Sequence, residues 1–322
     1  MRLRLSIIFC FASLLLTGWG HLGPKVKIGV SLDHTQGREP FLNKIREVLN
    51  DDHSDLLLKD PGNDPVAQAS QVKDLIQQGI QTLVVIPCDP SKATSLVTAA
   101  HAAGIKVIAL ERLIPDSDLD YFIDFNYKKA GELQARAIVK KAPKGNYELV
   151  DGYPEDWKTE DLRKGQMKVL QPLIDCGDIQ IEASKKGLPA NDHKVTTAIL
   201  TNSNINLMGS EPAESKKSDN VESQKLYIAG VGQNLMTCRR IVSGTQTMTV
   251  YAPPKKLAEE TAYLAAKLAR KATEFDCQFV EIPNGKKNVK AVLLTPLAVD
   301  AKNLDSTIIA DQVQKKEDVY GK

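Results

Sequence analysis

Short strand-like and helix-like segments alternate along most of this chain, and that alternation limits the possible folds more than any other feature. Residues 82–87 carry an unbroken apolar run, as expected for a strand that is covered on both faces. A helical pattern over residues 91–103 ends at Gly104, and the strand pattern Lys106–Leu110 follows directly. Strand–helix alternation at this short spacing predicts parallel sheets covered by helices, which is an α/β fold.

One late segment predicts where the chain passes between two such lobes. Over residues 247–251, Thr and Tyr alternate with Met and Val, which is typical of a strand. Prolines at positions 253 and 254 stop this strand and begin a helix over residues 255–272. A strand that ends so sharply and leads into a helix late in the chain is what a return crossing between two α/β lobes requires.

Two further crossings are expected, near Asn126 and near Pro296. The strand pattern Tyr121–Phe125 precedes the first, and an apolar stretch over residues 291–299 contains the other. The crossings divide the chain into two Rossmann-like lobes, residues 25–126 with 252–292 and residues 127–251 with 293–314. We expect residues 306–313 to add a last strand. Ligands of open α/β sheets bind beyond the carboxyl ends of the strands, so a cleft is predicted at the junction of the lobes.

The first 20 residues are typical of an export signal. Arg2 and Arg4 form a basic start, and the apolar stretch over residues 5–16 is too short to span a bilayer comfortably. We therefore expect a periplasmic protein; the alternative is an uncleaved membrane anchor. The formal net charge of the 322 residues is +2, which gives no reason to expect a nucleic-acid partner. We expect a monomer.

The sequence offers no catalytic or metal-binding constellation. Its five His residues stand far apart and lack metal-ligand spacing. Cys88, Cys176, Cys238 and Cys277 include no C-x-x-C pair, and their spacing assigns no disulfide. We expect a protein that is not an enzyme and that needs no metal or cofactor.

Charged and aromatic residues follow two predicted strands and are candidates for ligand contact. Glu111 and Arg112 come directly after the strand Lys106–Leu110. A guanidinium presents a fixed fork of donors that suits two adjacent sugar hydroxyls, and a neighbouring carboxylate accepts from hydroxyls. In the second lobe, Asp156 could accept hydroxyl hydrogens and the ring of Trp157 could pack on a pyranose. The alternative in each place is structural: an ion pair that holds a loop, or a solvated turn.

Four stretches carry a family resemblance: residues 131–135 (GELQA), 165–170 (GQMKVL), 244–251 (GTQTMTVY) and 293–296 (LLTP). They resemble the D-xylose-binding periplasmic proteins of sugar ABC importers. The resemblance extends over most of the chain and implies the type I periplasmic binding protein fold, with a monosaccharide as ligand and an ABC permease as partner. It also implies a set of sugar contacts. By position these fall on Arg112, Glu111, Asp156, Trp157, Asn202, Asn234, Arg38 and Phe41.

The chain departs from the family's pattern at several ligand positions and in one element. Ser203 and Gly232 stand where the family has acids, Ala252 replaces a Lys, and Lys158 replaces an Asn. Residues 184–196 are too few for the helical crossover that the family has there. These departures imply a degraded ligand site and a missing helix in the second lobe.

Two functions of different class remain. The first is capture of a monosaccharide, xylose or a similar sugar, for an ABC importer. The second is a non-transport relative that acts as a sugar sensor for a membrane receptor or histidine kinase, or that has lost sugar binding. The lost charged positions and the missing helix favour the second function. The intact framework and the Glu111-Arg112 pair favour the first, which is our hypothesis.

Overall fold

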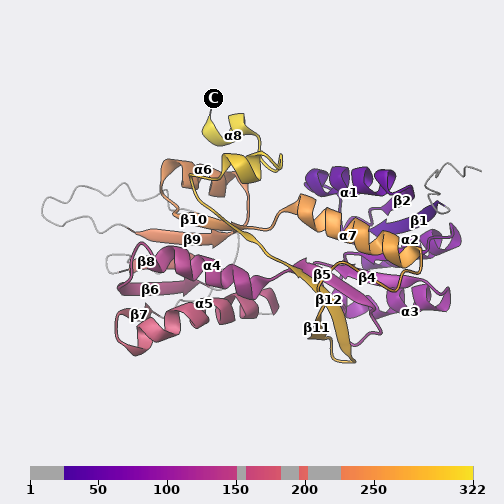
Figure 1. Ribbon diagram of the computed structural model, residues 1–322, viewed down its shortest axis with the longest axis horizontal. Helices are drawn as coiled ribbons and strands as arrows, with labels where there is room; N and C mark the ends of the chain where they lie inside the picture. The colour runs from indigo at the N-terminus through magenta and orange to yellow at the C-terminus, as the bar shows by residue number, and fades with distance from the viewer. Residues whose placement is uncertain (1–24, 151–156, 183–195, 202–225, 322) are drawn as a thin grey trace, which may run out of the picture.

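The computed structural model describes residues 25–150, 157–182, 196–201 and 226–321. These residues form two α/β lobes, each built on one sheet (Figure 1). None of the helices they form is long and apolar enough to cross a membrane. The predicted signal lies outside the described residues, and so does the segment predicted to lack a helix, apart from Thr196.

The first lobe contains a seven-stranded sheet in the order β11-β12-β5-β4-β3-β1-β2. Neighbouring strands are parallel except that β11 pairs antiparallel with β12. The strands are β1 (Val26–Ser31), β2 (Ser54–Lys59), β3 (Thr82–Val85), β4 (Lys106–Leu110), β5 (Tyr121–Phe125), β11 (Val280–Pro283) and β12 (Asn288–Leu294). The predicted strands at β4 and β5 are confirmed to the residue, and the sheet is parallel as expected.

Helices cover both faces of this sheet (Figure 1). They are α1 (Glu39–Asp51), α2 (Pro65–Gln77), α3 (Thr94–Ala102) and α7 (Pro254–Ala269). Helices α1 and α7 pack together on one face, and α2 and α3 cover the other. Along β3, Val84 packs in the apolar core on the face covered by α1 and α7, whereas Leu83 and Val85 pack in the core on the face covered by α2 and α3. Burial on both faces explains the unbroken apolar run of this strand.

The second lobe is built on a six-stranded sheet in the order β13-β10-β9-β8-β6-β7. Its strands are β6 (Gly145–Val150), β7 (Ile179–Glu182), β8 (Thr196–Thr201), β9 (Tyr227–Val231), β10 (Met248–Tyr251) and β13 (Leu297–Val299), of which only β13 runs antiparallel to its neighbour in the described pairings. Helices α4 (Tyr127–Val139) and α5 (Trp157–Asp175) pack against each other on one face, and α6 (Leu235–Ser243) lies on the other (Figure 1).

The C-terminal segment folds differently from the expected strand. Residues predicted as a strand form a π-helical turn, Asp305–Ile309, and the short helix α8 (Lys316–Tyr320) follows. Leu304, Ile308 and Val319 are buried with Tyr251 in a small core under α6. The strand prediction is wrong because Leu304 and Ile308 are buried while Ser306 between them is exposed. In a strand all three side chains would share one face, whereas in a helical turn only Leu304 and Ile308 do.

The four cysteines of the described residues are free thiols. Cys238 is buried in the core under α6, and Cys176 is exposed. Burial raises the pKa of the Cys238 thiol to about 11, so this side chain stays protonated and packs as an apolar group.

The chain passes between the lobes in three places. It leaves the first lobe after β5 at Asn126, returns after β10 at Ala252, and crosses again between β12 and β13 at Pro296. The backbone N–H of Asn126 donates to the carbonyl of Leu294 at 2.8 Å, so the first and last crossings lie side by side. The predicted two-lobe α/β fold with three crossings is confirmed.

Candidate ligand cleft between the two lobes

A cleft of about 560 Å³ lies between the lobes, beyond the carboxyl ends of several strands. That volume lies within the range of small-molecule sites in proteins. Its polar and charged lining residues come from both lobes: Arg38, Glu39, Glu111 and Asp124 from the first, and Lys158, Gln233, Asn234, Gln312 and Gln314 from the second. The first-lobe wall is therefore rich in charge, whereas the second-lobe wall is mostly amide.

Arg38 and Glu111 form a bidentate ion pair in the first-lobe wall. Arg38 lies just before α1, and Glu111 directly follows β4. The two Nη atoms of Arg38 donate to the two carboxylate oxygens of Glu111 at 2.9 and 3.1 Å. Glu111 has a φ of 60°, an uncommon value for a residue with a Cβ, and such backbone strain often occurs at functional sites.

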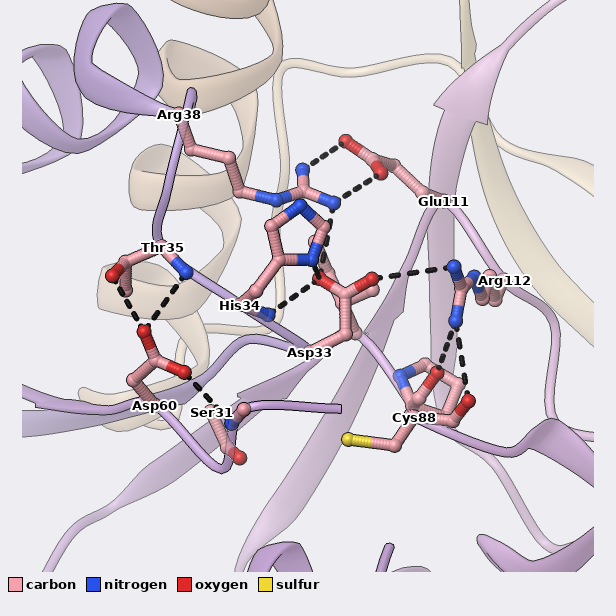
Figure 2. Close-up of polar contacts among 12 residues, drawn as sticks. Ser31, Asp33, His34, Thr35, Arg38, Asp60, Cys88, Glu111 and Arg112 are labelled. Atoms are coloured by element: carbon pink, nitrogen blue, oxygen red, sulfur yellow. Dashed lines mark hydrogen bonds and ion pairs between the residues drawn. The ribbon is translucent and has the colours of Figure 1, made fainter. Parts of the chain in front are cut away.

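Behind this pair lies Asp33, a fully buried carboxylate just beyond the end of β1 (Figure 2). Its Oδ1 accepts from Nη2 of Arg38 at 3.1 Å and from the backbone N–H of His34 at 2.9 Å. Its Oδ2 lies 3.2 Å from Nη2 of Arg112. One buried carboxylate thus holds two guanidinium groups. Sequence reasoning missed it, although an acid directly after an apolar strand was an available signal.

Arg112, one of the predicted ligand contacts, binds groups of its own lobe. Its Nη1 donates to the carbonyls of Pro87 at 3.1 Å and Cys88 at 3.2 Å, in addition to the ion pair with Asp33 (Figure 2). It is not among the residues that line the cleft. These contacts match the structural alternative, an ion pair that holds a loop, and a role in ligand binding stays a prediction.

Asp124 and Lys158 face each other across the lobes. Asp124 lies in β5 of the first lobe, is 1% exposed, and accepts from the backbone N–H of Phe125 at 2.7 Å. Nζ of Lys158, from α5 of the second lobe, lies 3.4 Å from its other oxygen and 5.0 Å from the centre of the Tyr127 ring. Burial, opposed in part by Lys158, raises the pKa of Asp124 to about 7. Sequence reasoning missed Asp124, whose signal is a lone acid in the apolar strand Tyr121–Phe125.

The other predicted residues fall into two groups. Phe41 and Asn234 both line the cleft: Phe41 is 2% exposed and packs in the first-lobe core, and Asn234 caps α6 by accepting from the backbone N–H of Thr237 at 2.7 Å. Asp156 and Asn202 lie outside the described residues, and Trp157 is described only as the first residue of α5. The structure thus brings together Arg38, Phe41, Glu111 and Asn234 at one cleft.

The chain is similar to known periplasmic sugar-binding proteins. A periplasmic binding protein domain model matches residues 28–273. A D-xylose-binding periplasmic protein of Haemophilus influenzae is 34% identical over 99% of this chain and 100% of that protein. A multiple sugar-binding periplasmic receptor of Rhizobium radiobacter is 29% identical over 77% of this chain and 79% of that protein.

A solved structure shares the fold. The ABC transporter solute-binding protein of Clostridium phytofermentans with bound β-D-glucose superposes with a TM-score of 0.73 over 91% of this chain and 99% of that one. Its sequence is 21% identical, so the likeness concerns the fold alone. The family itself is indicated by the family-model match and by the D-xylose-binding relative.

Proposed function

The chain belongs to the periplasmic binding protein family, alongside the D-xylose-binding periplasmic proteins, and from that premise we propose that it captures a monosaccharide in the periplasm for an ABC importer. The observation that carries the proposal is the cleft of about 560 Å³, which is lined from both lobes by charged and amide groups. A relative named for D-xylose binding matches over its full length, so xylose or a similar sugar is the proposed ligand. Its relatives are named as binding proteins, which supports a role in binding and not in catalysis.

The lining chemistry suits a neutral, hydroxylated ligand. Each sugar hydroxyl can donate one hydrogen bond and accept others. Glu111 and Asp124 offer carboxylate oxygens as acceptors, and Arg38 and the amide of Gln233 offer donors. Carboxylate and guanidinium groups give charge-assisted hydrogen bonds, which are stronger than those between neutral groups.

The proposed contacts extend beyond the described lining. We include Arg112, whose side chain is 41% exposed and lies next to Glu111 in the chain. Asp156 and Trp157 are included because a carboxylate could accept from a sugar hydroxyl and an indole ring could pack on a pyranose, and Asn202 is included because its position matches the family.

A second candidate function is sugar sensing. It is favoured by the match to a relative whose name describes a receptor, and by the residues Ser203, Gly232 and Ala252 at positions where the family carries charge. A sensor would deliver its signal to a membrane receptor or histidine kinase in place of a permease. Loss of binding is the extreme form of this alternative.

The test is a thermal-shift screen of the purified protein with D-xylose, D-glucose and D-arabinose. A ligand that binds only the native state stabilises it by about 2.7 kcal/mol at a hundred times its Kd, so Tm should rise with the cognate sugar. Sucrose at equal concentration controls for the general effect of osmolytes. No shift with any monosaccharide would contradict sugar capture.

Uptake measurements then separate import from sensing. A strain that lacks this protein should lose high-affinity uptake of the cognate sugar if the protein serves an importer. Unchanged uptake together with loss of a sugar-induced response would support the sensing function instead.

A further inference from the structure

We propose that Asp124 contacts the ligand directly and that Lys158 positions its carboxylate from the opposite lobe. The inference rests on the proposed function, because it assigns a further contact within the same cleft. Asp124 belongs to β5 of the first lobe and Lys158 to α5 of the second, and both line the cleft. The pair is therefore placed where a bound sugar would meet both lobes.

The carboxylate of Asp124 has one oxygen in a backbone hydrogen bond and one that is ion-paired with Lys158. Its Oδ1 accepts from the backbone N–H of Phe125 at 2.7 Å. Its Oδ2 is fully buried and accepts no hydrogen bond from the described residues, although the ammonium of Lys158 lies 3.4 Å away. A buried polar oxygen without a hydrogen bond is costly and uncommon, so it calls for a functional reason. A sugar hydroxyl entering the cleft would supply the missing donor.

The surroundings of Asp124 disfavour its ionised form and so reduce the stability of the folded protein. Burial raises its pKa to about 7, Lys158 lowers it, and Glu111 raises it further through like charge. Because the folded-state pKa is higher than the ordinary value of 3.8, folding stability falls as pH rises through this window and stays reduced above pH 7. A buried ionisable group that lowers the folding stability of a protein is typical of functional sites.

The charged groups around Asp124 determine how binding should depend on pH. Lys158 and the ring of Tyr127 face it from the second lobe, and Glu111, itself paired with Arg38, faces it from the first. A hydroxyl that donates to Asp124 favours the ionised form, so binding should be tight above pH 7 and weaken below it.

The experiment is calorimetric titration of D-xylose into the wild-type protein and its variants at pH 8, 7 and 6. If the sugar binds only the ionised form, Kd of the wild type should be about tenfold larger at pH 6 than at pH 8. Asp124→Asn keeps the shape but not the charge, so its Kd should be about tenfold weaker at pH 8 and constant with pH. Lys158→Met removes the cation that lowers the pKa of Asp124, so the midpoint of the pH dependence should move to higher pH.

Glu148→Gln is the matched control, because Glu148 is equally buried at 1% exposed but does not line the cleft. Its pH profile should follow the wild type. A wild-type pH profile in Asp124→Asn would overturn the inference. An unmoved midpoint in Lys158→Met would overturn the positioning role. If the wild type binds neither D-xylose, D-glucose nor D-arabinose at pH 8, the proposed function fails and this inference fails with it.

Discussion

At the scale of single residues, the first-lobe wall depends on one buried carboxylate. Asp33 is fully buried and contacts both Arg38 and Arg112, and Arg38 in turn holds Glu111 (Figure 2). The buried Asp33 thus orients Arg38 and, through Arg38, the carboxylate of Glu111 at the cleft. Preorganisation of this kind reduces the entropy that ligand binding must overcome.

Replacing Asp33 should therefore destabilise the protein and weaken sugar binding together. Asp33→Asn leaves two guanidinium groups without their shared counter-charge, and breaking a buried ion pair costs about 3 kcal/mol. Urea denaturation of the variant should show a loss of that size in the free energy of unfolding. Asp118→Asn is the control, since Asp118 pairs with Lys286 while both side chains are more than half exposed, at 55% and 51%. Its stability should change little, and an equal loss in both variants would contradict the special role of Asp33.

Sequence reasoning found part of this wall and missed its centre. Glu111 and Arg38 were identifiable because they follow a strand or match the family by position. Asp33 gains its importance because β1 pairs with β3 and β3 with β4, which brings residues 33 and 112 to one sheet edge. Periodicity along the chain does not give strand order. Asp124 was missed for a similar reason, since its partner Lys158 comes from the other lobe.

At the scale of elements, the local patterns predicted helices and strands well where burial is regular. The strands at β4 and β5 were predicted with their observed bounds, and the helix predicted over residues 255–272 is α7, Pro254–Ala269. The prediction failed in the C-terminal segment, where a π-helical turn and α8 replace the expected strand. Short elements that pack on a small core contain too few apolar residues for helical or strand periodicity to be recognised in the sequence.

Two of the family's characteristic stretches have a physical explanation at the crossing of α4 and α5. A Cβ on Gly131 would meet the carbonyl oxygen of Leu162, and one on Gly165 would meet that of Lys128. Beside this contact, Gln166 donates to Gln134 at 2.9 Å, and Gln134 donates to the carbonyl of Thr201 at 2.9 Å. These residues hold the helices to each other and to the sheet, so they identify the fold more than the ligand.

Substituting either glycine should force the two helices apart. Gly131→Ala and Gly165→Ala each place a methyl group against backbone that cannot rotate away, so we expect a loss of about 3 kcal/mol in the free energy of unfolding. Gly29→Ala is the matched control, because its nearest contact is Cδ1 of Ile80 at 2.6 Å, the end of a flexible side chain. Its cost should be smaller, about 1 kcal/mol. Chemical denaturation measures all three, and equal losses would contradict the close crossing.

At the scale of the whole molecule, each lobe has cores of its own. The residues of β1, β3, β4 and β5 pack with α1, α2, α3 and α7, whereas those of β6, β8, β9 and β10 pack with α4 and α5 or under α6. Among the described residues, three chain segments join the two bodies, and the Lys158–Asp124 ion pair links them through side chains. Separate cores linked by narrow crossings are the arrangement that allows hinge motion.

Sugar binding should therefore change the angle between the lobes. A ligand that contacts both walls favours the closed arrangement, because only there can it reach Arg38 and Glu111 on one side and Asn234 on the other. Small-angle X-ray scattering at pH 8 should show a smaller radius of gyration with saturating D-xylose than without it. Arg38→Ala is the control: it removes the guanidinium that links Asp33 to Glu111, so the same sugar concentration should leave its radius unchanged. A radius that is indifferent to a sugar which calorimetry shows to bind would mean that the lobes do not hinge, and that capture occurs in a cleft already closed.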